Sequence, residues 1–294
     1  MKLVIVANNS RPKVRQALED LTPWMKQRAE VVAIDTNHST DLATVGTDVV
    51  LVFGGDGTLL STARRLKGRQ LPLMGVNFGR LGFLASFTPA QFKENFEKLI
   101  ARKLPTTSRL ALEASVIAAE EKCALTDPAE VAAKRKFVST ALNDAVITAG
   151  PPFRMIELLV GPDIDPGVRF LGDGFIVATP SGSTAYSMSA GGPILGPTID
   201  AICVTPICPQ SLSFRPIVVN AHTKIVMIAK RVNKGTTLSC DGQEFMSISV
   251  GDKIVIQRAA SDVLIIENPH AREWRTLGEK LNWASHPQFN AASK

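Results

Sequence analysis

The sequence lacks the features that would place it in several large classes of protein. Its apolar runs are no longer than strands, far below the roughly 20 residues that a membrane-spanning helix needs. The apolar run at residues 3–7 is too short for the core of a signal peptide. The four cysteines form no C-x-x-C pair, which argues against a zinc site and against a disulfide framework. We therefore expect a cytoplasmic protein with no membrane partner.

Aromatic residues and dense basic segments are also scarce. The chain has one Tyr and three Trp, and its net charge of +6 is scattered along 294 residues. A nucleic-acid-binding surface is normally richer in basic residues and interleaves them with aromatic ones. We therefore expect no nucleic-acid partner, whereas a mild positive charge attracts a small anion such as a nucleotide. The length is sufficient for two hydrophobic cores.

The first hundred residues alternate between strand and helix patterns. Short apolar runs predict strands at residues 3–7, 31–34, 49–53 and 73–76. Helical spacing of apolar residues predicts helices at 12–26, from 59 to 66, and at 89–100. Repeated βα units with short links indicate an α/β N-terminal domain, in which helices cover a parallel, Rossmann-like sheet.

From residue 108 onward the segments are short and β-rich, and turn residues separate them. They predict strands at 110–118, 145–148, 155–160, 174–178, 217–219, 224–229, 236–239 and 253–257. Residues 120–136 look like a solvated hairpin or an insertion, and residues 272–281 have a helical pattern. We predict an α/β domain of residues 1–107, joined by 262–294, and an all-β domain of residues 108–261.

The loop Gly54-Gly55-Asp56-Gly57-Thr58 joins the apolar run 49–53 to a helix. Such glycine-rich turns bind phosphates through backbone N–H groups and the helix N-terminus. A phosphate would repel Asp56 unless a metal or a substrate hydroxyl lay between them, which favours phosphoryl transfer. No lysine follows, so this is not a P-loop, and Mg²⁺, amides and arginines from elsewhere must neutralise the phosphates.

A purely structural interpretation of this loop also exists. The glycines could supply a tight turn, and Asp56 could cap the helix. The position of the loop favours a ligand, because open α/β sheets bind ligands at the carboxyl ends of central strands.

Three other segments have residue types that suit a nucleotide. In the loop 77–84, Phe83 could cover a base or belong to the core. Arg80 could reach a phosphate, and a solvated side chain explains this residue equally well. Residues 179–193 hold five Ser and Thr side chains between Ser181 and Ser189, which suit a sugar and a base; a flexible linker or a short helix is the alternative. The pair Asn143-Asp144 could grip ribose hydroxyls, but an Asx turn is the stronger explanation for this pair alone.

Taken together, these segments resemble the NAD kinase family, which makes NADP from NAD. The Gly-Gly-Asp-Gly-Thr loop is moderately specific, because diacylglycerol and sphingosine kinases share it and phosphofructokinases have a similar one. The stretch Thr179–Pro193, preceded by Gly172-Asp173-Gly174, is far more specific. The resemblance covers nearly the whole chain and implies an α/β domain, a β domain, and a C-terminal helix that packs back on the first domain.

The resemblance also implies roles for individual residues. Asp56 resembles the residue that takes the proton from the adenosine ribose 2′-hydroxyl, and Asn143 and Asp144 resemble the pair that holds NAD through its ribose. The phosphate-cradling loop would consist of Gly54, Gly55, Gly57 and Thr58. The wall of the adenine pocket would consist of Phe83, Thr184, Ala185 and Ser189. Tyr186 and Asp173 resemble contacts to the dinucleotide, with Asp173 toward its nicotinamide end.

The family acts with a divalent cation, and ATP or polyphosphate is the phosphoryl donor. We therefore expect Mg²⁺ or another divalent cation, with no direct protein ligand assigned to it, and a homodimer or homotetramer. Two positions depart from the family: Gln210 stands where many members have His, and Asp144 stands where many have Glu. Gln210 keeps hydrogen bonding without charge, and Asp144 keeps the charge on a shorter side chain.

Two other functions remain open at this point. A lipid or sugar kinase could share the glycine loop, although residues 179–193 argue against a lipid substrate. A catalytically silent NAD-binding sensor is the second alternative, and the intact loop Gly54–Thr58 argues against it.

Overall fold

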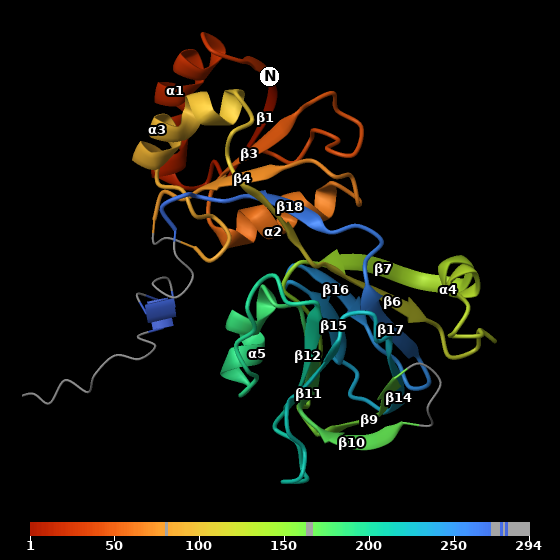
Figure 1. The fold of residues 1–294 in the computed structure, drawn as a ribbon. Helices are drawn as coiled ribbons and strands as arrows, with labels where there is room; N and C mark the ends of the chain where they lie inside the picture. Colours follow the sequence, from red (N-terminus) through yellow and green to blue (C-terminus); the bar gives the residue numbers. More distant parts are fainter. Residues whose placement is uncertain (80–81, 163–166, 272–276, 279, 282–294) are drawn as a thin grey trace, which may run out of the picture.

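The computed structural model describes residues 1–79, 82–162, 167–271, 277–278 and 280–281. Figure 1 shows two halves: an α/β half that contains the N-terminus, and a β-rich half that packs against it. The helix predicted at 272–281 lies largely outside the described residues, although the four described positions in it are helical. Within the described residues, no helix is long and apolar enough to cross a membrane.

The α/β half is built on a six-stranded sheet with the order β2-β1-β3-β4-β18-β5. Its strands are β1 (Lys2–Ala7), β2 (Glu30–Asp35), β3 (Val49–Phe53), β4 (Leu73–Val76), β5 (Thr106–Arg109) and β18 (Val263–Ile266). The pairings from β2 to β18 are parallel, and β5 runs antiparallel to β18. The strand β3 lies inside the sheet and is buried along its whole length, as its continuous apolar run predicts.

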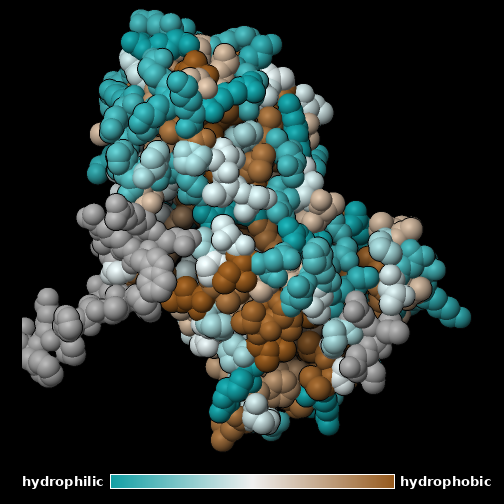
Figure 2. Space-filling view, viewed as in Figure 1, coloured by the Kyte–Doolittle hydropathy of each residue, from teal (hydrophilic) through white to brown (hydrophobic). Residues whose placement is uncertain are grey.

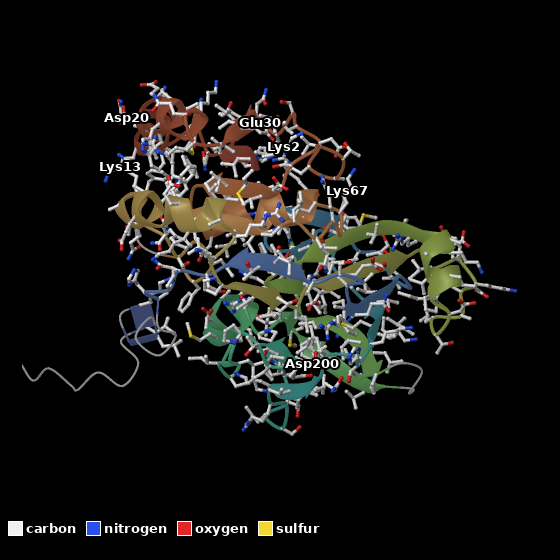
Figure 3. The ribbon with its side chains drawn as sticks, turned by 45° about the horizontal axis from the view of Figure 1, so that its top comes forward. Lys2, Lys13, Asp20, Glu30, Lys67 and Asp200 are labelled. Atoms are coloured by element: carbon white, nitrogen blue, oxygen red, sulfur yellow. The ribbon has the colours of Figure 1, made fainter. Side chains whose placement is uncertain are left out.

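Helices cover both faces of this sheet: α1 (Pro12–Lys26) and α3 (Pro89–Ile100) pack on one face, and α2 (Asp56–Arg65) packs on the other. The helix α1 buries apolar residues at helical spacing, Val14, Leu18, Leu21 and Met25. Its other face is hydrophilic in Figure 2, and charged residues such as Lys13 and Asp20 project outward in Figure 3. Thr88 caps α3 through a reciprocal bond with Gln91, as the sequence Thr-Pro predicts.

The β-rich half consists of two six-stranded antiparallel sheets. The first has the order β10-β9-β14-β17-β6-β7, and the second has the order β13-β12-β11-β8-β15-β16. The strands of the first are β6 (Leu112–Ile117), β7 (Arg135–Ala141), β9 (Ile156–Pro162), β10 (Val168–Gly172), β14 (Ile225–Arg231) and β17 (Lys253–Arg258). The strands of the second are β8 (Asp144–Thr148), β11 (Gly174–Ala178), β12 (Ala201–Ile207), β13 (Ile217–Asn220), β15 (Thr237–Cys240) and β16 (Glu244–Ser247). Side chains from both sheets form one hydrophobic cluster between them.

The predicted fold class, an α/β domain followed by an all-β domain, is confirmed, but several elements differ from the prediction. The strand predicted at 110–118 is β6, and the preceding strand β5, which belongs to the other sheet, was not predicted. The segment 120–136 is not a simple hairpin: it contains the short helix α4 (Pro128–Lys134) and the start of β7. The helix predicted from residue 59 begins three residues earlier, so Asp56 belongs to its first turn.

Candidate active site

Asp56 is the first residue of α2, and its carboxylate anchors the loop that follows β4. One oxygen, Oδ2, accepts a hydrogen bond from the N–H of Phe83 at 2.8 Å. The other, Oδ1, accepts from the N–H groups of Leu84 at 3.1 Å and Ala85 at 2.9 Å. The strands β3 and β4 are parallel neighbours, so the loops at their carboxyl ends meet at one edge of the sheet. The structure thus brings Asp56 and Phe83 together.

The approach of Asp56 to this loop leaves no space for a side chain at residue 82. A Cβ atom on Gly82 would lie 1.8 Å from Oδ1 of Asp56. The loop Gly54–Thr58 around Asp56 forms the end of β3 and the first turn of α2, with Gly55 as the N-cap. The first amides of a helix have no partner inside it and carry partial positive charge. The loop can therefore bind an anionic group beside the carboxylate.

The pair Asn143-Asp144 lies where the β-rich half meets α2. Its backbone is held by Asp241, a residue that the sequence analysis missed. The carboxylate of Asp241 accepts hydrogen bonds from the N–H groups of Leu142 at 3.1 Å, Asn143 at 2.7 Å and Asp144 at 3.2 Å. Asp241 and Gly242 both have positive φ and form the turn between β15 and β16. The Asp-Gly dipeptide is a hairpin signal that could have located this turn.

Asp144 is a buried carboxyl group, with 5% of its surface exposed. Within the described residues, no donor reaches its carboxylate. Burial, and secondarily the charge of Asp241, raise the pKa of Asp144 to about 7. Burial also raises the pKa of Asp241, but three amide donors and Arg64 oppose this effect. Asp144 is therefore the member of the pair that carries a proton below neutral pH, and it has free capacity to bond a ligand hydroxyl.

The segment 179–193 is fixed on Asn143 and Leu142. The N–H of Thr179 donates to the carbonyl oxygen of Asn143 at 2.8 Å, and its hydroxyl donates to that of Leu142 at 2.6 Å. Gly182 passes so close that a Cβ atom there would lie 2.0 Å from the Asn143 carbonyl oxygen. The segment is therefore an ordered part of the site and not a flexible linker.

The hydroxyl groups of this segment divide into two sets. Ser183 and Ser187 are fully buried and satisfy other protein groups: Ser183 bonds Pro180 and Leu195, and Ser187 contacts Thr205 at 2.9 Å. Thr184 and Ala185 are half-buried, and Tyr186 and Ser189, the ends of the short helix α5 (Tyr186–Ser189), are exposed. The interpretation of all these hydroxyls as ligand contacts was too broad, because a core position needs its own hydrogen bonds.

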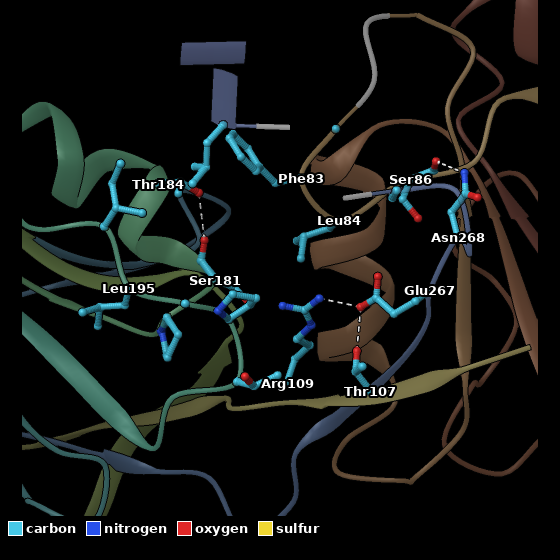
Figure 4. A pocket seen from close by; sticks show the side chains of 18 residues that line it. Phe83, Leu84, Ser86, Thr107, Arg109, Ser181, Thr184, Leu195, Glu267 and Asn268 are labelled. Carbon is cyan, nitrogen blue, oxygen red and sulfur yellow. Dashed lines mark hydrogen bonds and ion pairs between the residues drawn. The ribbon is translucent and has the colours of Figure 1, made fainter. Parts of the chain in front are cut away.

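A cavity of about 620 Å³ lies between the two halves (Figure 4). The loop after β4 contributes Phe83 and Leu84, and the segment 179–193 contributes Ser181 and Thr184. The cavity thus joins two of the residues assigned to the adenine wall, Phe83 and Thr184. An ion pair between Arg109 and Glu267 lines it as well, and the Thr107 hydroxyl donates to Glu267 at 2.6 Å.

Other predicted residues lie farther away or outside the described residues. Asp173 is exposed and precedes β11, whereas Thr179 and the paired Asp144 lie at the other end of this strand. At about 3.3 Å per residue the two ends are roughly 15 Å apart. Gln210 is exposed and lies near Asp173, since its N–H donates to Leu171 at 2.8 Å. Arg80 lies outside the described residues.

A lysine from the end of the chain also approaches the site. The Nζ of Lys280 lies 4.0 Å from the centre of the Phe83 ring. Burial lowers the pKa of Lys280, and the charge of Asp56 opposes this effect. The sequence analysis looked for a lysine only next to the glycine loop, so it missed this one. Within the described ranges, no group of three or more His, Cys, Asp or Glu residues could hold a metal ion.

Comparison with known families identifies both halves. Residues 3–104 match the ATP-NAD kinase N-terminal domain, and residues 142–268 match the ATP-NAD kinase C-terminal domain. The chain belongs to the NAD kinase family. It is therefore a phosphotransferase, as the resemblance noted above implies.

Individual relatives agree with this assignment along nearly the whole chain. The NAD kinase of Rhodopirellula baltica is 34% identical over 96% of this chain and 87% of its own length. The NAD kinase of Desulforamulus reducens is 36% identical over 94% of this chain and 96% of its own length.

Two solved structures have the same fold. A yeast NADH kinase complexed with NADH matches with a TM-score of 0.85 at 25% identity, covering 100% of this chain and 90% of that chain. An NAD kinase from Archaeoglobus fulgidus in complex with ATP matches with a TM-score of 0.74 at 25% identity, covering 96% of this chain and 99% of that chain.

We predict that Gly82→Ala lowers the turnover of the enzyme, because the added methyl group would collide with the Asp56 carboxylate and push the loop of Phe83 away from it. Gly79→Ala in the same loop is the control, since the nearest atom to its Cβ would be 3.7 Å away. Turnover should fall at least about tenfold in the first variant only, as a displacement of about 1 Å suffices for such losses. Equal activity of both variants would contradict the close contact.

We predict that Asp144→Asn makes the folded protein less sensitive to pH. The pKa of Asp144 is about 7 in the folded state against a reference of 3.8. The folded state therefore binds this proton more tightly, and wild-type stability falls as pH rises from 4 to 7. The melting temperature of Asp144→Asn, measured from pH 4.5 to 8, should rise relative to wild type with increasing pH. Asp173→Asn, at an exposed position, is the control. A melting temperature of Asp144→Asn that changes with pH just as that of wild type does would refute the raised pKa of Asp144.

Proposed function

We propose that the protein transfers the γ-phosphoryl group of ATP to the 2′-hydroxyl of the adenosine ribose of NAD. The observation that carries this assignment is the fixed carboxylate of Asp56 at the N-terminus of α2, which accepts a hydrogen bond from the N–H of Phe83, a residue that lines the cavity. The relative from Archaeoglobus fulgidus was solved with ATP, which supports ATP as the donor. Polyphosphate as a second donor and NADH as a second acceptor are tested below.

The proposed mechanism divides the work between two sets of groups. The amides of Gly55 and Gly57, with Gly54 allowing the tight turn, hold the donor phosphates at the positive end of α2. The N–H of Thr58 closes the turn by donating to the carbonyl oxygen of Gly55 at 3.0 Å. Asp56 accepts the proton of the ribose hydroxyl as the new O–P bond forms and the bond between the γ-phosphorus and the ADP leaving group breaks. A divalent cation, Mg²⁺ or another, would arrive with the donor phosphates and neutralise their charge. Lys280 adds positive charge near Asp56.

The acceptor is held by residues from both halves. We place the adenine between Phe83 and Thr184, with Ala185 and Ser189 beside it, because the first two line one cavity. Asn143 and Asp144 then bond the ribose, and the unpaired carboxyl group of Asp144 gains a donor. Asp173, Tyr186 and Gln210 would contact the distant end of the dinucleotide, because Asp173 and Gln210 lie beyond the far end of β11.

We also propose that the protein is a homodimer or homotetramer. The apolar side chains of Leu212, Ile217 and Val218 are exposed, and the last two belong to β13, an edge strand of its sheet. Figure 2 shows apolar surface on the β-rich half, in contrast to the hydrophilic cover of the α/β half. An edge strand with apolar residues favours pairing with another chain.

We expect NADP to form when the protein is incubated with NAD, ATP and Mg²⁺, as measured by a coupled dehydrogenase assay specific for NADP. Parallel reactions with polyphosphate and with NADH define the donor and the acceptor. The absence of NADP despite measurable NAD binding would favour a sensor. Phosphorylation of a lipid or sugar in place of NAD would favour the other kinases that share the glycine loop.

We expect Asp56→Asn to bind NAD but to lose about 10²- to 10⁴-fold in turnover, the usual contribution of a general base. The amide oxygen can still accept bonds from Leu84 and Ala85, whereas its NH₂ group faces the N–H of Phe83, so some thermal stability is lost as well. Calorimetric titration with NAD and steady-state kinetics separate the two effects. Turnover above a few per cent of wild type would exclude Asp56 as the base.

A further inference from the structure

A group of polar side chains joins α2 to the hairpin of β15 and β16 across the boundary between the two halves. The group consists of Arg64, Asp241 and Gln243, and we name it the Arg64 clasp. None of these residues lines the cavity, and none has a part in the mechanism proposed above. The three residues nevertheless contact the two segments that carry the proposed mechanism, the first turn of α2 and residues 142–144.

Gln243 contacts the first turn of α2. Its Nε2 donates to the carbonyl oxygen of Gly57 at 2.8 Å, and Gly57 directly follows Asp56 in the chain. Its Oε1 accepts a hydrogen bond from Nη2 of Arg64, the second-to-last residue of the same helix. Gln243 therefore touches α2 near both of its ends, beside Asp56 and at Arg64.

Asp241 holds the other substrate segment. Its side chain is 1% exposed and accepts three hydrogen bonds from the backbone of residues 142–144. Arg64 Nη1 lies 3.7 Å from Asp241 Oδ2, and Arg64 Nε lies 3.8 Å from Glu244 Oε1. The guanidinium group thus connects the helix that carries Asp56 to the carboxylate that fixes Asn143 and Asp144.

An apolar contact next to the clasp also holds α2 against the β-rich half, but it does not fix their exact spacing. Leu142 is buried in one cluster with Leu59, Leu60 and Ala63 of α2. Hydrophobic contacts are non-directional, so they hold the two halves together but allow them to shift. Hydrogen bonds and ion pairs have a preferred geometry, so those of the clasp fix the position of the two halves relative to each other, which the apolar contact does not do.

We propose that Arg64, Asp241 and Gln243 are positioning residues that set the distance between Asp56 and the pair Asn143-Asp144. The inference rests on the proposed function, in which a ribose held by the pair presents its hydroxyl to Asp56. Because Gly57 and Asn143 belong to different halves, an error in their spacing leaves each binding site intact but separates the hydroxyl from its base. A misplacement of about 1 Å can cost about 100-fold in rate.

The first test is Gln243→Ala, with Gln70→Ala as the matched control. Gln70, which is exposed, likewise bonds a distant segment through its side-chain amide, at the carbonyl oxygen of Asp262, and no hydrogen bond among the described residues joins it to the first turn of α2. We expect kcat of Gln243→Ala to fall about tenfold or more while the KM values for NAD and ATP change less than about threefold. The Gln70 variant should match wild type. Unchanged kcat in Gln243→Ala, or a loss confined to KM, would overturn the proposal.

The second test is a double-mutant cycle on kcat with Gln243→Ala and Arg64→Met, since methionine keeps much of the apolar stem. If the clasp acts as a unit, the double variant should lose little more activity than the worse single variant. Arg64→Lys, which keeps the charge near Asp241, should recover part of the loss. Additive losses, or losses that parallel the fall in melting temperature across all variants, would indicate only a structural role and overturn the proposal.

Wild-type protein in the same assays separates the two levels of inference. If wild type makes no NADP from any donor, the proposed function fails. If wild type is active and the clasp variants keep its kcat, only the clasp proposal fails.

Discussion

The anchoring of the Asp56 carboxylate by three backbone amides is the interaction on which the rest of the site depends. It joins the end of β3 to the loop after β4, places Phe83 beside the carboxylate, and requires glycine at residue 82. The geometry has an electrostatic reason, because a negative group is stabilised at the N-terminus of a helix. It also explains how a phosphate loop can contain an acid. The carboxylate is turned toward the loop of Phe83, and the amides that precede Thr58 remain for phosphate, since the N–H of Thr58 donates to Gly55.

Two further carboxyl groups, those of Asp144 and Asp241, are buried close together, but they differ in the number of hydrogen-bond donors around them. Asp241 receives three amide bonds and an arginine, so its burial is compensated and it stabilises the junction. Asp144 receives no such compensation from the described residues, and its raised pKa of about 7 records that cost. A buried group without a partner is expensive, so a ligand hydroxyl that bonds Asp144 would recover part of this energy. The fold thus gives up some stability at a position where substrate binding can regain it.

The sequence predicted the parts of the fold with strong periodicity. The bounds of α1, β3, β4 and α3 agree with the prediction because their apolar residues follow one clear period between turn or cap signals. Edge strands such as β5, β7, β10 and β16 were missed, because their exposed residues dilute the apolar alternation. The strand β12 was missed although it is buried, since Pro206 interrupts its run. The strand β18 joins a sheet whose other members precede it by more than 150 residues, a pairing that no local pattern encodes.

The same division holds for the site. The sequence by itself determined which segments bear chemistry, since a glycine turn after a buried strand and a run of small hydroxyl residues are local patterns. Only the tertiary structure decided which members of those segments are available to bind a ligand. Ser183 and Ser187 form hydrogen bonds inside the protein, whereas Phe83 and Thr184 line one cavity. Tertiary structure alone also brought Gln243 to Arg64, 179 residues away, and Lys280 to Phe83. The physical reason is that hydrogen bonds and burial depend on distance in space, which sequence spacing does not fix beyond a single strand, turn or helix.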